Sequence, residues 1–176
     1  CKENDILLMI DEVQTGNGRT GKLYCYEHYG IYPDIVTTAK GLGGGLPIGA
    51  VLFGEKTENT LSYGMHGSTF GGNPVCAAGA LSIVKRLDNE LFEQVCSKGE
   101  YLKEELLKLP KVETVSGMGL MIGVKTTLPA SQVAAECLEK GLMVLTAKEN
   151  VRLLPALNIP FELLERAVAI LGEVLS

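Results

Sequence analysis

Residues 35–45 read Ile-Val-Thr-Thr-Ala-Lys-Gly-Leu-Gly-Gly-Gly, an apolar run that ends in a lysine and a glycine-rich turn. Short apolar runs of this kind are typical of strands buried in a parallel sheet, and a similar run over 5–13 reaches Asp11. The carboxyl ends of neighbouring strands meet at one rim of an α/β sheet, where ligands bind. We therefore expect strands over 35–39 and 5–13, with Lys40 and Asp11 emerging together at that rim.

The rest of the chain predicts an α/β part followed by an α+β part. A third strand is expected over 48–53, with no helix between it and the glycine turn. Pro74 suits the first position of a long helix, and Pro110 suits the end of a second. Beyond Pro110 the patterns predict strands at 112–115, 120–125, 142–146 and 151–154, and helices at 129–140 and 161–175. The expected parts are residues 1–75, connecting helices over 76–110, and a small C-terminal α+β domain over 111–176.

Composition excludes several classes of protein. The chain has 176 residues with a formal net charge of −5, which argues against an electrostatic nucleic-acid binder. Its longest apolar stretch, 6–10, is far shorter than the ~18 residues that span a bilayer. The five cysteines form no Cys-x-x-Cys pair, so neither a disulfide framework nor a metal site is expected. We expect a soluble, cytoplasmic protein that binds neither nucleic acid nor membrane.

An acid and an amine beside a glycine-rich turn suit pyridoxal phosphate. A lysine can bind its aldehyde covalently, and an aspartate can pair with its ring nitrogen. Taken singly, Lys40 also fits a solvated strand end and Asp11 a turn or a helix cap. A nucleotide-binding glycine loop is the third alternative, but the run 41–45 has neither the phosphate-loop nor the dinucleotide spacing.

A series of segments carries a resemblance to a known family. They are DEVQTG at 11–16, GRTGKL at 18–23, YEHYG at 26–30, PDI at 33–35, TAKGLGGG at 38–45, HGSTFGGNP at 66–74 and ENVRLLP at 149–155. In this order, along nearly the whole chain, they closely resemble the class III aminotransferases, which depend on pyridoxal phosphate. The resemblance implies the fold-type I architecture, with 1–75 as the later part of the large, cofactor-binding domain and its sheet.

The resemblance also implies catalytic and cofactor-binding roles in the first segments. Lys40 would hold the cofactor covalently and then act as general base and acid, and Asp11 would pair with the pyridine nitrogen. Gln14 would contact the ring hydroxyl, and Glu12 and Val13 would complete the cofactor-binding stretch.

Three further residues receive roles from the resemblance. Thr69 would hydrogen-bond the cofactor phosphate across the interface of a homodimer. Ser68 would lie beside the bound substrate, and Arg152 would clamp the substrate carboxylate, for which a two-pronged guanidinium is suited.

Within the family, the chain most resembles the branch that exchanges the amino group of N2-acetylornithine with 2-oxoglutarate in arginine biosynthesis. Enzymes that act on ornithine, succinylornithine, 4-aminobutyrate or glutamate semialdehyde share the same core and stay alternatives. The chain starts at Cys1, just before an apparently buried strand, and the family's other phosphate loop and stacking aromatic ring come from upstream sequence. We therefore expect a C-terminal half of such an enzyme. The alternative from another class is a non-catalytic folded module.

Overall fold

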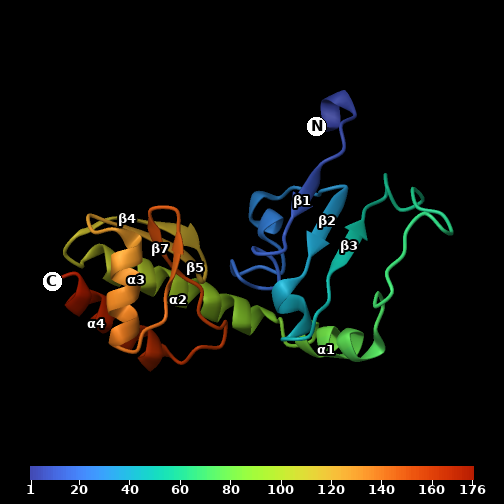
Figure 1. The fold of residues 1–176 in the computed structure, drawn as a ribbon. Helices are drawn as coiled ribbons and strands as arrows, with labels where there is room; N and C mark the ends of the chain where they lie inside the picture. Colours follow the sequence, from blue (N-terminus) through green and yellow to red (C-terminus); the bar gives the residue numbers. More distant parts are fainter. The chain divides into compact units, whose positions relative to one another are not determined.

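The computed structural model describes residues 1–176, which form two compact units (Figure 1). The first unit comprises Cys1–Gly18 and Lys22–Asn89, and the second comprises Arg19–Gly21 and Glu90–Ser176. Packing thus assigns the two expected connecting helices over 76–110 to different units, one to each. The assignment of residues 1–75 and 111–176 to a large and a small domain stays a prediction.

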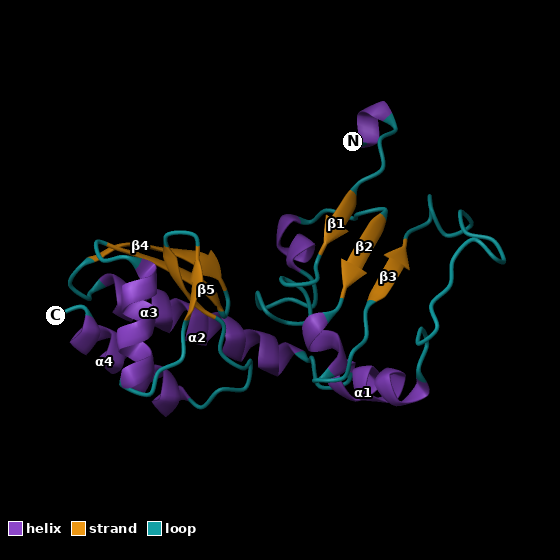
Figure 2. Cartoon of the chain, viewed as in Figure 1, coloured by secondary structure: helices purple, strands orange, loops and turns teal.

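The first unit contains a three-stranded sheet in the order β1-β2-β3 (Figure 2). Its strands are β1 (Met9–Asp11), β2 (Ile35–Thr38) and β3 (Ala50–Phe53). β1 pairs with β2 in parallel, as expected, and β3 pairs with β2 antiparallel. The three predicted strands are confirmed in position, although β1 is much shorter than the range 5–13.

Two expectations for this unit were wrong. The strand over 5–13 was expected to be buried on both faces, but Met9 is 67% exposed, because its face of the sheet is left uncovered. No helix was expected after β2, but Lys40–Gly43 forms a single 3₁₀ turn, η3. Its backbone closes through bonds from Leu42 N to Ala39 O (3.0 Å) and from Gly44 N to Gly41 O (3.2 Å).

Helix α1 (Pro74–Val84) begins at the predicted proline. Asn73 caps it, since its Oδ1 accepts hydrogen bonds from Val75 N (3.0 Å) and Cys76 N (3.2 Å). A side-chain acceptor at this position satisfies amide groups that have no partner within the helix. α1 packs against η3, the turn that begins at Lys40.

The second unit is an α+β arrangement, as predicted. It contains α2 (Asn89–Leu107), β4 (Val112–Met118), β5 (Met121–Thr126), α3 (Ala130–Glu139), β6 (Leu145–Ala147), β7 (Asn150–Leu153) and α4 (Phe161–Val174). The sheet is antiparallel throughout, in the order β4-β5-β7-β6. No helix of the structure is both long enough and apolar enough to cross a membrane.

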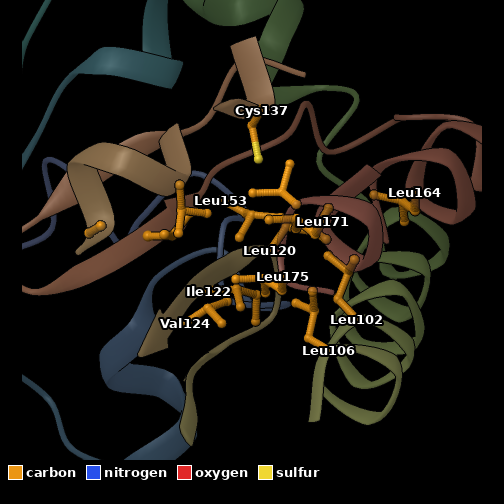
Figure 3. Packing of buried hydrophobic residues seen from close by; sticks show 14 of the residues in the cluster. Leu102, Leu106, Leu120, Ile122, Val124, Cys137, Leu153, Leu164, Leu171 and Leu175 are labelled. Atoms are coloured by element: carbon orange, nitrogen blue, oxygen red, sulfur yellow. The ribbon is translucent and has the colours of Figure 1, made fainter. Parts of the chain in front are cut away.

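The core of the second unit lies between this sheet and its helices (Figure 3). The register pairs Ile122 with Leu153 and Val124 with Val151, so alternate residues of β5 and β7 share one buried face. Leucines of the helices complete the cluster, among them Leu102, Leu106, Leu164 and Leu171. Burying each such side chain stabilises the fold by about 1.5–3 kcal/mol.

The approach of α2 to the turn between β4 and β5 yields a stability prediction. A Cβ added at Gly99 would collide with the backbone of Gly119, which cannot move as a side chain can. Gly99→Ala should gain about 1 kcal/mol of helix propensity but lose more through overpacking, for a net destabilisation of about 1–2 kcal/mol. Urea unfolding measures it. Gly67→Ala is the control, since open space surrounds Gly67, and an unchanged midpoint for Gly99→Ala would contradict the prediction.

Candidate active site

Asp11 is the last residue of β1, and its carboxylate is held by two hydrogen bonds. Val13 N and Thr37 Oγ1 each donate to Asp11 Oδ1, both at 2.9 Å. Thr37 is the residue opposite Asp11 in the parallel register. Both bonds lower the pKa of Asp11, and the bond from Val13 N has the larger effect. The charge of Lys40 lowers this pKa further. Asp11 is therefore an exposed, ionised carboxylate whose Oδ2 makes no hydrogen bond.

Lys40 follows β2 at the same rim of the sheet. Its φ of 48° lies in the left-handed region, which costs a side-chain-bearing residue about 1–2 kcal/mol. The side chain is exposed and forms no ion pair, yet its charge is close enough to lower the pKa of Asp11. The structure thus brings together the two residues for which a catalytic role was predicted.

The support beneath Lys40 was missed by sequence analysis. Asn17 is 6% exposed, and its Nδ2 donates to Thr38 Oγ1 and to Ala39 O, both at 3.0 Å. The Thr38 hydroxyl also hydrogen-bonds Tyr24, whose pKa is raised mainly by burial. The sequence offered one signal for this support: Asn17 stands between two glycines, and asparagine tolerates the left-handed backbone conformation that a turn can require.

Glu12, Val13 and Gln14 have different surroundings. Glu12 is 1% exposed and accepts hydrogen bonds from Tyr26 N (2.9 Å) and from the Thr15 hydroxyl. The Glu12 side chain therefore holds the segment after β1 in place. Val13 and Gln14 are half-buried, and cofactor contacts of all three residues stay predictions.

Ser68 and Thr69 lie in the exposed segment between β3 and α1. Their local structure is a turn in which Gly71 N donates to Ser68 O (3.2 Å). No hydrogen bond joins either residue to Asp11 or Lys40. The predicted role of Thr69 requires a second subunit, so it stays a prediction, as does the substrate contact of Ser68.

Arg152 belongs to β7 of the second unit. Its Nε is buried without a hydrogen-bond partner, and the residue lines a mostly apolar cavity of about 470 Å³ together with Arg166 of α4. A guanidinium that lines a cavity suits a carboxylate ligand. The position of Arg152 beside a substrate at Lys40 stays a prediction.

Comparison with known proteins defines the class. The family described as aminotransferase class-III matches residues 1–175, and the chain belongs to this family. Acetylornithine aminotransferases of Haemophilus ducreyi and Aquifex aeolicus are 49% and 45% identical, over 100% and 99% of this chain but 45% and 46% of theirs. The chain therefore spans about half the length of the curated relatives that it matches.

Solved structures agree with that assignment. The ornithine delta-aminotransferase of Plasmodium falciparum has a TM-score of 0.89 at 37% identity, covering 99% of this chain and 48% of that one. Acetylornithine aminotransferase of Elizabethkingia anophelis has a TM-score of 0.88 at 34% identity, covering 99% and 47%. The predicted fold class, part of a fold-type I pyridoxal-phosphate transferase, is confirmed.

The residues at the rim fit the cofactor of this family, pyridoxal phosphate. Asp11 presents an ionised carboxylate with one oxygen unengaged, which suits a protonated ring nitrogen. Lys40 presents an exposed amine without an ion pair, which suits an aldehyde. The structure gathers no group of three or more His, Cys, Asp or Glu side chains able to hold a metal ion, and none of its five cysteines forms a disulfide.

The hydrogen bond from Thr37 yields the second prediction. Thr37→Val keeps the side-chain shape but removes the donor, so the pKa of Asp11 should rise toward 3.8. A carboxylate pKa depressed by folding stabilises the protein above the pKa of the unfolded chain, and this stabilisation disappears as pH falls through the folded pKa. The variant should therefore be less stable than the wild type above pH ~4, and this difference in stability should disappear as the pH falls through the pKa of Asp11. Carboxyl NMR titration measures the change, Thr37→Ser is the control, and an unchanged Asp11 pKa in Thr37→Val would refute the prediction.

Proposed function

We propose that these residues supply the cofactor-binding lysine and carboxylate of an acetylornithine aminotransferase, which exchanges the amino group of N2-acetylornithine with 2-oxoglutarate. The observation that carries the proposal is the pair of Asp11 and Lys40 at the carboxyl ends of two parallel-paired strands. The membership in the class III family supports it. The chain spans about half the length of the curated relatives that it matches, and we propose that the complete site also draws groups from outside these residues.

Pyridoxal phosphate, when bound, supplies an electron-withdrawing ring that makes the carbon bearing the amino group acidic. Asp11 stabilises a proton on the ring nitrogen, because its carboxylate stays ionised at neutral pH. Lys40 anchors the aldehyde through its amine. When the amino group of the substrate takes the place of Lys40 on the cofactor, the freed Lys40 amine would remove a proton from the substrate carbon that bears the amino group. It would then return this proton to the former aldehyde carbon of the cofactor.

The substrate assignment rests on names and on one side chain. Curated relatives at 41–49% identity are acetylornithine aminotransferases. 2-Oxoglutarate has one carboxylate beside its oxo carbon and another at its far end. N2-acetylornithine has a single carboxylate, at the end remote from its free amino group. The guanidinium fork of Arg152 can bind such a carboxylate at two points. Ornithine is the alternative substrate, because solved neighbours include ornithine aminotransferases.

The wider setting follows from the same proposal. The reaction places the protein in arginine biosynthesis in the cytoplasm. We further propose a homodimer in which Thr69 of one subunit contacts the cofactor phosphate held by the other and Ser68 lies beside the substrate. The exposure of both residues in the first unit supports this arrangement.

Replacing Lys40 tests the proposal directly. In the intact protein, Lys40→Ala should abolish the visible absorption band of bound cofactor, and kcat should fall by at least about 10²–10⁴-fold because the proton carrier is lost. Borohydride reduction and peptide mapping should locate the cofactor on Lys40 in the wild type. Lys22→Ala, a change at another exposed lysine of the first unit, should behave as the wild type.

The outcomes separate the alternatives. A band that persists in Lys40→Ala would remove Lys40 as the anchor. The absence of any band in the intact wild-type protein would favour a non-catalytic module.

Arg152 offers a test of the substrate class. Arg152→Lys keeps the charge but loses the fork, so the KM for 2-oxoglutarate should rise about 10–100-fold, corresponding to a lost charge-assisted bond of about 1.5–3 kcal/mol. Initial rates with acetylornithine, ornithine, succinylornithine and 4-aminobutyrate identify the amino donor. Arg166→Lys, at the other arginine that lines the cavity, is the control. An equal rise in KM for both variants would contradict a specific role of Arg152.

A further inference from the structure

The backbone of Lys40 adopts a conformation that its own sequence does not favour. Its φ of 48° is left-handed, which a lysine rarely adopts. Glycines, which tolerate such an angle, stand at Gly41 and Gly43–Gly45, but the left-handed angle falls on the lysine before them. The direction in which the Lys40 side chain leaves the rim depends on this angle. Some contact must therefore hold the peptide groups on either side of Lys40.

Asn17 makes that contact from another part of the chain. Its Nδ2 donates to the carbonyl of Ala39, the residue before Lys40, and to the hydroxyl of Thr38. On the other side of Lys40, a Cβ added to Gly41 would lie 3.6 Å from Asn17 Cβ, so the two residues pack together. Asn17 thus touches both flanks of the lysine.

Stability alone explains this asparagine poorly. Asn17 is 6% exposed, and its Oδ1 has no hydrogen-bond partner in the structure. A buried acceptor without a donor is destabilising, and an apolar side chain of similar size would avoid that cost. The two donated hydrogen bonds are what an apolar residue could not supply. In addition, Asn17 itself has a φ of 56°, which asparagine tolerates.

We propose that Asn17 is a positioning residue for Lys40, whose amide fixes the Thr38-Ala39 end of β2 and thereby holds Lys40 in its left-handed conformation with the amine aimed at the rim. The catalytic consequence rests on the proposed function, whereas the conformational effect on Lys40 does not.

The first measurement needs no cofactor. Backbone ¹³C shifts and the HN–Hα coupling of Lys40 report its φ in solution. Asn17→Gly keeps the left-handed backbone possible at position 17 and removes the amide, and Asn17→Asp keeps the shape and removes the donor. Both variants should lose the left-handed signature of Lys40. Thr57→Val is the matched control, because it removes a hydroxyl whose proton is shared between Asp34 O and Gly54 O, elsewhere in the first unit.

The second measurement follows the amine of Lys40. Trapping by pyridoxal phosphate and borohydride, quantified at Lys40 by peptide mass spectrometry, should slow about 10- to 100-fold in both Asn17 variants, as expected for a misplaced reacting group. The kcat should fall by a similar factor with the KM for 2-oxoglutarate unchanged. Thr57→Val should lower the unfolding midpoint without changing either rate.

Each outcome has one meaning for Asn17. Retention of the left-handed signature of Lys40 in Asn17→Gly and Asn17→Asp overturns the inference, whatever the activity. Loss of the signature in both variants, but not in Thr57→Val, supports it. If the wild type shows no selective trapping at Lys40, the proposed function fails while the conformational result still decides the inference.

Discussion

The parallel pairing of β1 with β2 in one register is the constraint on which the candidate site depends. That register sets Asp11 opposite Thr37, so the hydroxyl reaches the carboxylate and helps to lower its pKa. A shift by one residue would turn Asp11 to the other face of the sheet. Lys40 would then lie at a rim without its counter-charge. The backbone pairing of β1 with β2 therefore decides which side chains can contact Asp11 and Lys40.

The two units are stabilised in different ways. The second has a continuous apolar core of leucine, isoleucine and valine side chains from all its helices and from β5 and β7. In the first unit, few apolar side chains are buried, and the rim is held by buried polar groups such as Glu12, Asn17 and Thr38. Apolar side chains on β1 and β3 are exposed, Met9 and Val51 among them. Such a face is typical of a surface that other protein covers.

The sequence allowed the element order and the pair of Asp11 and Lys40 to be predicted, because apolar periodicity marks strands and strand ends mark the rim. The start of a helix could also be predicted from the sequence, since α1 begins at Pro74 as expected. The supporting hydrogen bonds were not, because Thr37 and Asn17 act through register and through contacts 21–26 residues apart in the chain. The burial of β1 was overestimated for a related reason. The apolar residues of a strand indicate that its faces can be buried. They do not indicate whether the residues that would cover those faces are present in the same chain.

Residues that mark the family do not all serve chemistry. Arg19 stands in the same run of glycines as Asn17, yet it packs with the second unit, where its Nη1 donates to Leu120 O (3.1 Å) and Pro155 O (2.5 Å). Burial lowers the pKa of Arg19, but a guanidinium stays charged at any physiological pH. Leu120 precedes β5 and Pro155 follows β7 at the same end of these paired strands, so the buried guanidinium joins the two segments there. Pro155 lies three residues after Arg152, so Arg19 restrains the segment that follows the proposed carboxylate-binding residue. One short motif thus contains a residue that supports the lysine and another that supports the strand of the arginine.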